Sequence, residues 1–245
     1  MTNSYVPAQE TCLLPSNGAW YDTKEVTLRM KTTLEVKKGY ASTGPRTEPD
    51  IIQNCIISPD NVNIYDLAVF DAVYLMYRLR MLTWGSMLPQ VFVCPFCGKV
   101  HEEELDLDML EIKNVPEEFT LEPLELPLTK HKLTFRFLTL EDYIQCQIEG
   151  RQKQQEYPDA EENFENSMIV ERHIETVDGK KLTGIELTSF LNKLPARDYA
   201  YIEAYSDKID TMFGVDEKVE VECSNCQNKF THLVQLTRQF FRPTI

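Results

Sequence analysis

Two pairs of cysteines are the residues whose type and spacing are best suited to chemistry. Cys94 and Cys97 lie in VFVCPFCGKVH, and Cys223 and Cys226 lie in VEVECSNCQNKF. In an intracellular protein a CxxC pair is typical of half of a tetrahedral zinc site. The spacing therefore predicts one Zn²⁺ ion held by all four thiolates. A closed set of four thiolates leaves no open coordination position, so we expect the zinc to be structural.

Other roles for these cysteines are less consistent with the pattern. A redox CxxC pair usually begins a helix, but β-type residues flank both pairs here. Unligated thiols at exposed turns would be prone to oxidation. His101 and His232 lie close enough in sequence to replace one cysteine as a ligand, whereas His131 and His173 are interpreted as solvated loop residues.

The flanking residues predict that each pair lies at the tip of a β-hairpin, which we call a knuckle. QVFV precedes the first pair and EVEV precedes the second. Both segments are rich in the β-branched and aromatic residues that favour strands. The two knuckles nevertheless lie far apart in the chain, which requires an explanation in the intervening sequence.

An internal repeat supplies that explanation. VTLRMKTTLE (26–35) aligns without a gap with LTFRFLTLED (133–142). Each segment predicts a strand that ends at a helix with a capping box, formed by Thr32 with Glu35 and by Thr139 with Asp142. A long helix is then expected over 58–85 and another over 194–214, with Pro195 at the first helical position of the latter. Two half-domains would thus each contribute one knuckle.

The predicted fold class is α+β, built from a duplicated strand–helix–CxxC-hairpin unit whose knuckles join in one zinc-ribbon-like site. The first half-domain is expected over residues 1–110 and the second over 111–245, closed into one compact body. The polar stretch 149–167 is interpreted as the exposed end of a helix and a loop.

Composition argues against several classes of function. The formal net charge of −14 disfavours nucleic acid as the main partner. The apolar run 64–84 carries charges that are costly in lipid, and the N-terminus resembles no secretory signal. No phosphate-binding glycine loop, GxSxG or HExxH motif occurs, so no enzyme and no small-molecule substrate is predicted. The acidic run 101–111 is interpreted as a solvated strand face with Leu105, Leu107 and Met109 turned inward.

The chain ends in an aromatic segment with two interpretations. Phe240, Phe241 and Arg242 either fold back onto the protein or form a docking segment for another subunit.

The order of these motifs resembles a known family. LLPSNGAWYD, IIQNCIISP, RLRMLTWG before CPFCG, LPARD and the closing FFRPTI are similar to segments of the baseplate hub and hub-assembly proteins of T-even-type contractile-tailed bacteriophages. The resemblance extends over nearly the whole chain and includes all four cysteines. It implies a virion protein of the tail baseplate, assembled in the host cytoplasm, whose partners are other tail proteins.

Two hypotheses follow from the sequence. The first is a structural or assembly component of the baseplate hub that acts as a zinc-stabilised protein–protein adaptor. The second is a zinc-ribbon subunit of a nucleic-acid-processing complex, which would require a basic surface around the knuckles. The sequence around the knuckles is instead acidic, with Glu102, Glu103, Glu104, Glu220 and Glu222. The first hypothesis is therefore favoured.

Overall fold

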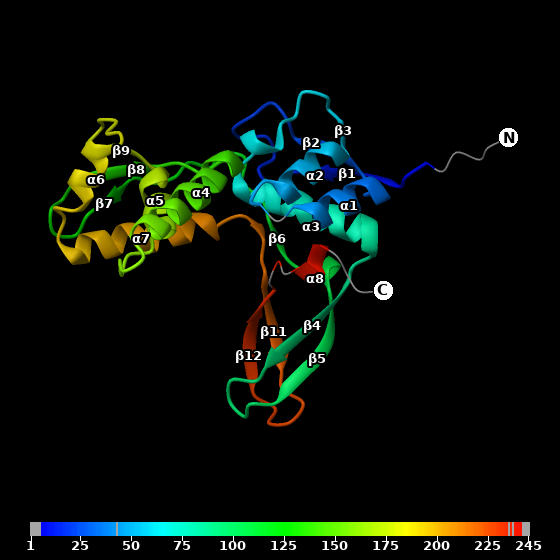
Figure 1. Cartoon of the computed structure of the whole chain (residues 1–245). Helices are drawn as coiled ribbons and strands as arrows, with labels where there is room; N and C mark the ends of the chain where they lie inside the picture. Colours follow the sequence, from blue (N-terminus) through cyan, green and yellow to red (C-terminus); the bar gives the residue numbers. More distant parts are fainter. Residues whose placement is uncertain (1–5, 43, 235, 237, 242–245) are drawn as a thin grey trace.

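A computed structural model of the protein describes residues 6–42, 44–234, 236 and 238–241. The chain forms two lobes, each of helices packed with a small sheet, and a stalk of two β-hairpins that projects from the junction between the lobes (Figure 1). Each sheet is small and antiparallel, so the α+β class is confirmed. The division at residues 110 and 111 remains a prediction.

The first lobe packs a three-stranded sheet, ordered β1-β2-β3, against helices. Its elements are β1 (Gln9–Leu13), β2 (Glu25–Arg29), α1 (Thr33–Ala41), α2 (Thr47–Cys55), β3 (Ile56–Ser58), η1 (Ile64–Asp66) and α3 (Val69–Trp84). Their apolar faces bury one cluster that includes Leu28, Ile52, Ile64 and Leu75.

The second lobe repeats this order of elements. It contains β7 (Leu124–Glu125), β8 (Lys132–Phe135), α4 (Leu140–Glu156), α5 (Phe164–His173), β9 (Ile174–Val177), α6 (Ile185–Leu191) and α7 (Ala196–Asp210), with the sheet order β7-β8-β9. The register shifts at Thr27/Leu28 where β2 meets β3, and at the aligned Thr134/Phe135 where β8 meets β9. The insertion in the second lobe is α6, for which the first lobe has only η1.

Both predicted capping boxes are confirmed. The Thr32 hydroxyl lies at the N-cap of α1 with Glu35 at its third position, and Thr139 with Asp142 repeats the arrangement in α4. Within each lobe, an arginine three residues upstream of the capping threonine pairs with the capping acid. The distances are 2.8 Å for Arg29 with Glu35 and 2.6 Å for Arg136 with Asp142.

The long helix of the first lobe begins later than the sequence indicates. Asn63 caps only the short η1, and α3 starts at Val69. Leu67 and Val69 instead exchange backbone hydrogen bonds with Leu140 and Leu138 of the second lobe, at 2.9 and 3.0 Å. Such a long-range pairing leaves no trace in local sequence. Pro195 is the N-cap of α7 rather than its first helical residue.

Aromatic side chains fill the junction between the lobes. Phe70 at the start of α3 stacks edge-on against Phe137 and Phe213, with ring centroids 5.4 and 5.9 Å apart. Trp20 and Phe119 complete the cluster. Because Phe70 comes from the first lobe and Phe137 from the second, this cluster helps to hold the lobes together.

The stalk contains both knuckles. The first hairpin is β4 (Met87–Val93) with β5 (Val100–Asp106), and the second is β11 (Lys218–Glu222) with β12 (Lys229–Leu233). Its base is completed by η2 (Leu107–Met109), the pair β6 (Ile112–Lys113) and β10 (Gly214–Val215), and α8 (Arg238–Phe241). The hairpins lie side by side and bring their tips together (Figure 1).

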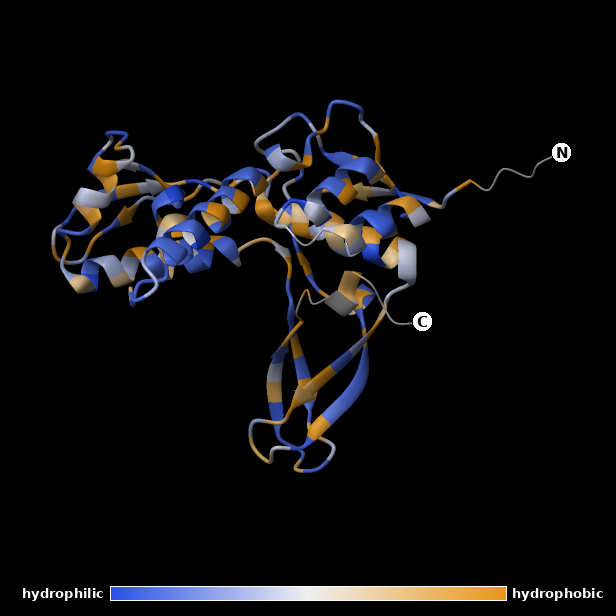
Figure 2. Cartoon of the chain, viewed as in Figure 1, coloured by the Kyte–Doolittle hydropathy of each residue, from blue (hydrophilic) through white to orange (hydrophobic). Residues whose placement is uncertain are grey.

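The acidic run on β5 is largely solvated. Figure 2 shows hydrophilic residues along much of the strand, and Glu102, Glu103 and Glu104 are exposed. Leu107 is buried, but the prediction for Met109 is wrong because its side chain is 80% exposed. The strand ends at Asp106 and the chain continues as η2, which breaks the two-residue alternation.

The polar stretch 149–167 divides between three elements. Helix α4 extends to Glu156, a loop follows, and α5 begins at Phe164. Gly150 permits the close packing of the two helices, since a Cβ there would lie 2.6 Å from the Cα of Glu165.

Among the described residues, no helix combines the length and apolar composition that crossing a membrane requires.

Candidate metal centre

The two knuckles have the same backbone turn. The Cys94 amide donates to the Lys99 carbonyl at 2.8 Å, and the Gly98 amide returns to the Cys94 carbonyl at 2.9 Å. In the second turn, Cys223 and Gln227 repeat both bonds at 3.0 and 2.8 Å. Gly98 and Gln227 have the positive φ angles of 71° and 59° that close the turn. Each turn places two cysteine side chains on one side.

The hairpins then bring the four sulfurs into one cluster. The Sγ atoms of Cys94, Cys97, Cys223 and Cys226 all lie within 4.8 Å of one another. The distances across the two hairpins are 3.7 Å from Cys94 to Cys226 and 3.6 Å from Cys97 to Cys223. A tetrahedral metal with bonds of about 2.3 Å to sulfur requires sulfur–sulfur distances of about 3.8 Å. The geometry therefore fits a metal ion, while all four cysteines are free of disulfide bonds.

Hydrogen-bond donors surround the sulfurs. The side-chain amides of Asn225 and Asn228 donate to Cys97 and Cys226 at 3.5 and 3.4 Å. Burial opposes ionisation of Cys223, but backbone N–H groups and His101 lower the pKa of its thiol to about 5. The amide of Asn225 is the main cause of the lowered pKa of Cys97. Such donors favour the thiolate form that binds metals.

At Cys94 burial is the dominant effect and raises the thiol pKa to about 11. Cys94, Cys97 and Cys223 therefore differ in their readiness to ionise before a metal binds. A cation at the centre of the cluster would favour deprotonation of Cys94 as well, because metal coordination competes directly with the proton.

The two neighbouring histidines occupy different places around the cluster. His101 is buried, with Nε2 3.3 Å from Cys223 Sγ and Nδ1 3.3 Å from a Glu103 carboxylate oxygen. Its ring stacks on Phe92 with centroids 5.2 Å apart. His232 instead bonds to Gln90 Oε1 at 3.2 Å. His101 thus lies outside the four-cysteine cluster and contacts one of its sulfurs, that of Cys223.

The interpretation of His173 as a solvated loop residue is wrong. This residue ends α5 and is fully buried, with Nδ1 2.9 Å from the Arg136 carbonyl and Nε2 3.0 Å from Asp210. His131 is 39% exposed and pairs with Asp178 at 2.6 Å. The polar sequence around His173 concealed the tertiary contacts that bury its ring.

The terminal aromatic pair packs onto the protein. Phe240 is fully buried, with its ring 4.8 Å from that of Tyr77 in α3, and Phe241 is half-buried beside it. Of the two sequence interpretations, the structure therefore has Phe240 folded back, and its ring is not available to dock elsewhere. Arg242, the third candidate docking residue, lies outside the described residues.

Two buried carboxylates at matching positions escaped the sequence analysis. Asp71 and Asp198 each lie in the first turn of the long helix of their lobe and are fully buried. Asp71 accepts the Ser16 amide at 2.9 Å, whereas Asp198 accepts the amides of Leu128 and Thr129 and the Thr129 hydroxyl. Each acid anchors the loop between the first two strands of its lobe. The shared Leu-Pro at 14–15 and 126–127 is the sequence signal that relates these loops.

The chain was compared with known proteins. A protein family described as T4 bacteriophage base plate protein matches residues 6–242, a range that includes both knuckles and both lobes. None of the curated proteins and none of the solved structures matches the chain.

Proposed function

Because this chain belongs to the T4 bacteriophage base plate protein family, we propose that it is a structural component of the baseplate hub or of its assembly pathway. In this role the protein acts through contacts with other tail proteins and resides in the virion tail after assembly in the host cytoplasm. The family match over residues 6–242 is the observation that carries the baseplate role, and the cluster of four sulfurs at the ends of two sequence-distant hairpins supports a metal-stabilised adaptor.

Zn²⁺ is the metal that best suits the cluster. Four cysteine thiolates in a tetrahedral arrangement are typical of structural zinc sites, whereas Mg²⁺ and Ca²⁺ prefer oxygen ligands. Cys94, Cys97, Cys223 and Cys226 would fill all four coordination positions. The zinc would therefore serve stability and leave no position for a substrate.

The site joins two copies of one structural unit. Both lobes follow the same element order, have a capping box at the aligned position and place a buried acid in the first turn of the long helix. We interpret residues 1–110 and 111–245 as duplicated half-domains, each of which supplies one hairpin to a zinc-ribbon-like stalk. A single metal then fixes the half-domains as one adaptor.

The acidic surface of the stalk favours a protein partner over nucleic acid. Glu102, Glu103 and Glu104 on β5 and Glu220 and Glu222 on β11 are exposed near the metal site. These carboxylates would repel a phosphate backbone at the place where a nucleic-acid-binding zinc ribbon needs cations. The alternative of a nucleic-acid-processing subunit is therefore disfavoured.

A Cys94→Ser variant tests the metal and the assembly role together. We expect about one zinc per wild-type chain by mass spectrometry of purified protein. The variant should lose the metal and have a lower melting temperature, because a structural zinc site contributes on the order of 10 kcal/mol in small zinc peptides. In a phage that lacks the wild-type copy, the variant should also enter fewer purified particles.

Cys146→Ala provides the matched control, since Cys146 is buried within α4 and lies outside the sulfur cluster. This variant should retain zinc. A wild-type protein that contains no zinc would refute the metal assignment. A zinc-loaded wild-type protein that is absent both from purified virions and from baseplate assembly intermediates would refute the baseplate role.

A further inference from the structure

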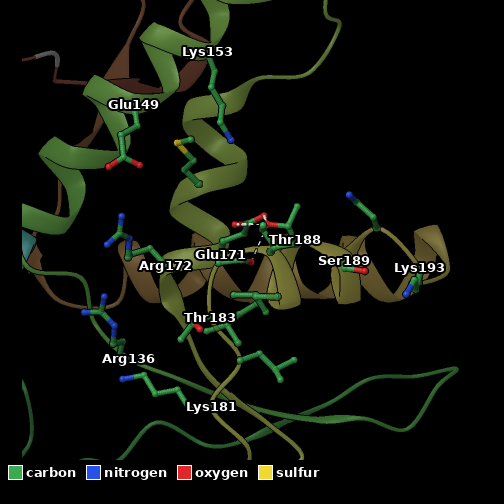
Figure 3. Close-up of a pocket in the computed structure, with 17 residues that line it drawn as sticks. Arg136, Glu149, Lys153, Glu171, Arg172, Lys181, Thr183, Thr188, Ser189 and Lys193 are labelled. Atoms are coloured by element: carbon green, nitrogen blue, oxygen red, sulfur yellow. Dashed lines mark hydrogen bonds between the residues drawn. The ribbon is translucent and has the colours of Figure 1, made fainter.

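A basic cleft of about 1000 Å³ lies in the second lobe (Figure 3). The helices that border it lie far from the tips of the stalk hairpins (Figure 1). It is bounded by α4, α5 and α6 and by the segment between β9 and α6. The first lobe has only the short η1 where the second has this segment and α6. The insertion that distinguishes the two lobes therefore supplies part of the wall of the cleft.

Cations gather in this cleft although the chain as a whole is strongly acidic. Its lining includes five cationic side chains and two carboxylates, and the cations are Arg136, Lys153, Arg172, Lys181 and Lys193. Figure 3 shows Arg136, Arg172 and Lys181 close to one another at the left of the view, with Lys153 at the top and Lys193 at the right.

Much of this positive charge is not neutralised within the protein. Arg136 and Arg172 share one carboxylate, that of Asp142, at 2.6 and 3.7 Å. Lys181 and Lys193 are exposed and form no ion pair within the described part of the chain. Glu171 is engaged by the Thr188 hydroxyl at 3.1 and 3.2 Å. A ligand with several negative charges would therefore find unpaired cations here.

The remaining lining suits a polypeptide more than a nucleic acid. Leu182 and Met168 are half-buried in the cleft, and Ile185 at its rim is 88% exposed. The described lining residues include no aromatic side chain on which bases could stack, as single-stranded nucleic acids usually require. Thr183, Ser189 and Asn192 offer polar groups to a peptide backbone.

From this combination we propose that the cleft binds an acidic segment, interspersed with apolar side chains, of another tail protein. This inference rests on the proposed baseplate role, which supplies such neighbours. A second copy of the chain is the weaker candidate, since two bodies that each carry a charge of −14 repel one another. The cations would attract the acidic residues of the segment. Its apolar side chains would pack against Met168, Leu182 and Ile185 of the cleft.

A labelled peptide tests the proposal without phage particles. The probe is a synthetic twelve-residue peptide in which glutamate and aspartate alternate with leucine and serine, and its binding is followed by fluorescence anisotropy. The zinc-loaded full chain should bind it, whereas the same peptide with amides in place of the acids should not bind. The double variant Lys181→Glu/Lys193→Glu should weaken binding by about tenfold or more.

The matched control is Lys37→Glu/Lys38→Glu, which makes the same change of charge on the exposed surface of α1. It should alter the peptide affinity less than about twofold. Equal losses in both double variants, or equal binding of the amide peptide, would overturn the proposal. So would tighter binding of a single-stranded oligonucleotide, or self-association of the wild-type chain that Lys181→Glu/Lys193→Glu abolishes. Each result leaves the zinc and virion measurements of the proposed function unchanged.

Discussion

Two equivalent acids show how the number of hydrogen bonds alters the chemistry of a buried residue, because in the described part of the chain Asp71 accepts one and Asp198 accepts three. Burial raises the pKa of Asp71 to about 7, only partly opposed by Ser16, and its Oδ2 has no partner among the described residues. Burial would also raise the pKa of Asp198, but bonds from Thr129 and the Leu128 amide together hold that pKa below its ordinary value. The second lobe thus stabilises a charge that the first lobe disfavours.

Asp71→Asn should therefore reduce the dependence of stability on pH. The raised pKa means that the folded chain binds more protons than the unfolded chain between the ordinary value of 3.8 and about 7. Stability consequently falls as pH rises through this range. Asparagine keeps an acceptor for the Ser16 amide and cannot ionise. We expect the loss of unfolding free energy between pH 5 and pH 8 to be smaller in the variant by about 1–3 kcal/mol, measured by urea denaturation.

Asp198→Asn is the matched comparison and should behave differently. Because the pKa of Asp198 is lowered in the folded chain, its carboxylate stabilises the fold at pH values above its ordinary pKa of 3.8. This stabilisation is lost as the pH falls through the pKa of the folded state. An asparagine would replace one acceptor oxygen with an amide donor opposite the Thr129 amide or the Leu128 amide. The melting temperature of the Asp198→Asn variant should therefore be lower than that of the wild type at pH 7. A similar response of both variants to pH would contradict the electrostatic difference between the lobes.

At the scale of elements, the two knuckles differ in one residue that controls their turns. Gly98 and Gln227 occupy the same left-handed position, which costs a residue with a side chain about 1 kcal/mol more than glycine. A Gln227→Gly variant should therefore stabilise the second hairpin by about 1 kcal/mol, since the Gln227 side chain is exposed. The melting temperature of the zinc-loaded protein would measure the gain.

The reciprocal substitution supplies the control for this turn. A Cβ at Gly98 would meet no atom within 4 Å, so Gly98→Gln tests backbone strain without a steric clash. It should lower the melting temperature by an amount similar to the gain at Gln227. If Gln227→Gly destabilises the protein, strain at the left-handed position is not what limits this turn.

Elements with local signals were predictable from the sequence. The capping boxes at Thr32 and Thr139 and the hairpins around the cysteine pairs depend on residues within a few positions of one another, so the pattern suffices. The start of α3 was not predictable, because Leu67 and Val69 pair with residues of the second lobe. The prediction that Met109 turns inward was wrong because the strand gives way to η2, which interrupts the alternation of inward and outward side chains.

The sulfur cluster and the basic cleft also differ in how far the sequence predicts them. The sulfur cluster could be anticipated because each CxxC pair is recognisable alone and only the meeting of the pairs required tertiary structure. The basic cleft could not, since Arg136, Arg172, Lys181 and Lys193 come from separate segments with no shared motif. Each of these residues resembles an ordinary surface cation until the fold places them around one cavity.

At the scale of the whole molecule, the stalk depends on few apolar contacts. The lobes have large buried clusters, whereas the buried residues of the stalk itself are few, Phe92 and Val221 among them. The base of the stalk is better supported, because Leu88 and Phe240 pack there with Tyr77 of α3. The four-cysteine end is therefore the part of the molecule that most needs a metal.

Removal of zinc should loosen the stalk and leave the lobes folded. A chelator releases the constraint that joins two distant segments, and the loop between Cys97 and Cys223 regains conformational freedom. Hydrogen exchange measured by mass spectrometry should accelerate in β4, β5, β11 and β12. Amides of α3 and α7 should keep their protection, because the apolar clusters around Leu75 and Ile202 do not involve the metal.

Addition of Zn²⁺ should restore protection in the stalk, and Cys94→Ser should show the accelerated exchange without a chelator. These two controls separate loss of the metal from nonspecific effects of the chelator. Uniform loss of protection over the whole chain would mean that the lobes require the metal to fold. Unchanged exchange in all four strands would instead mean that contacts between the hairpins suffice, and the sulfur cluster would then contribute little to the rigidity of the adaptor.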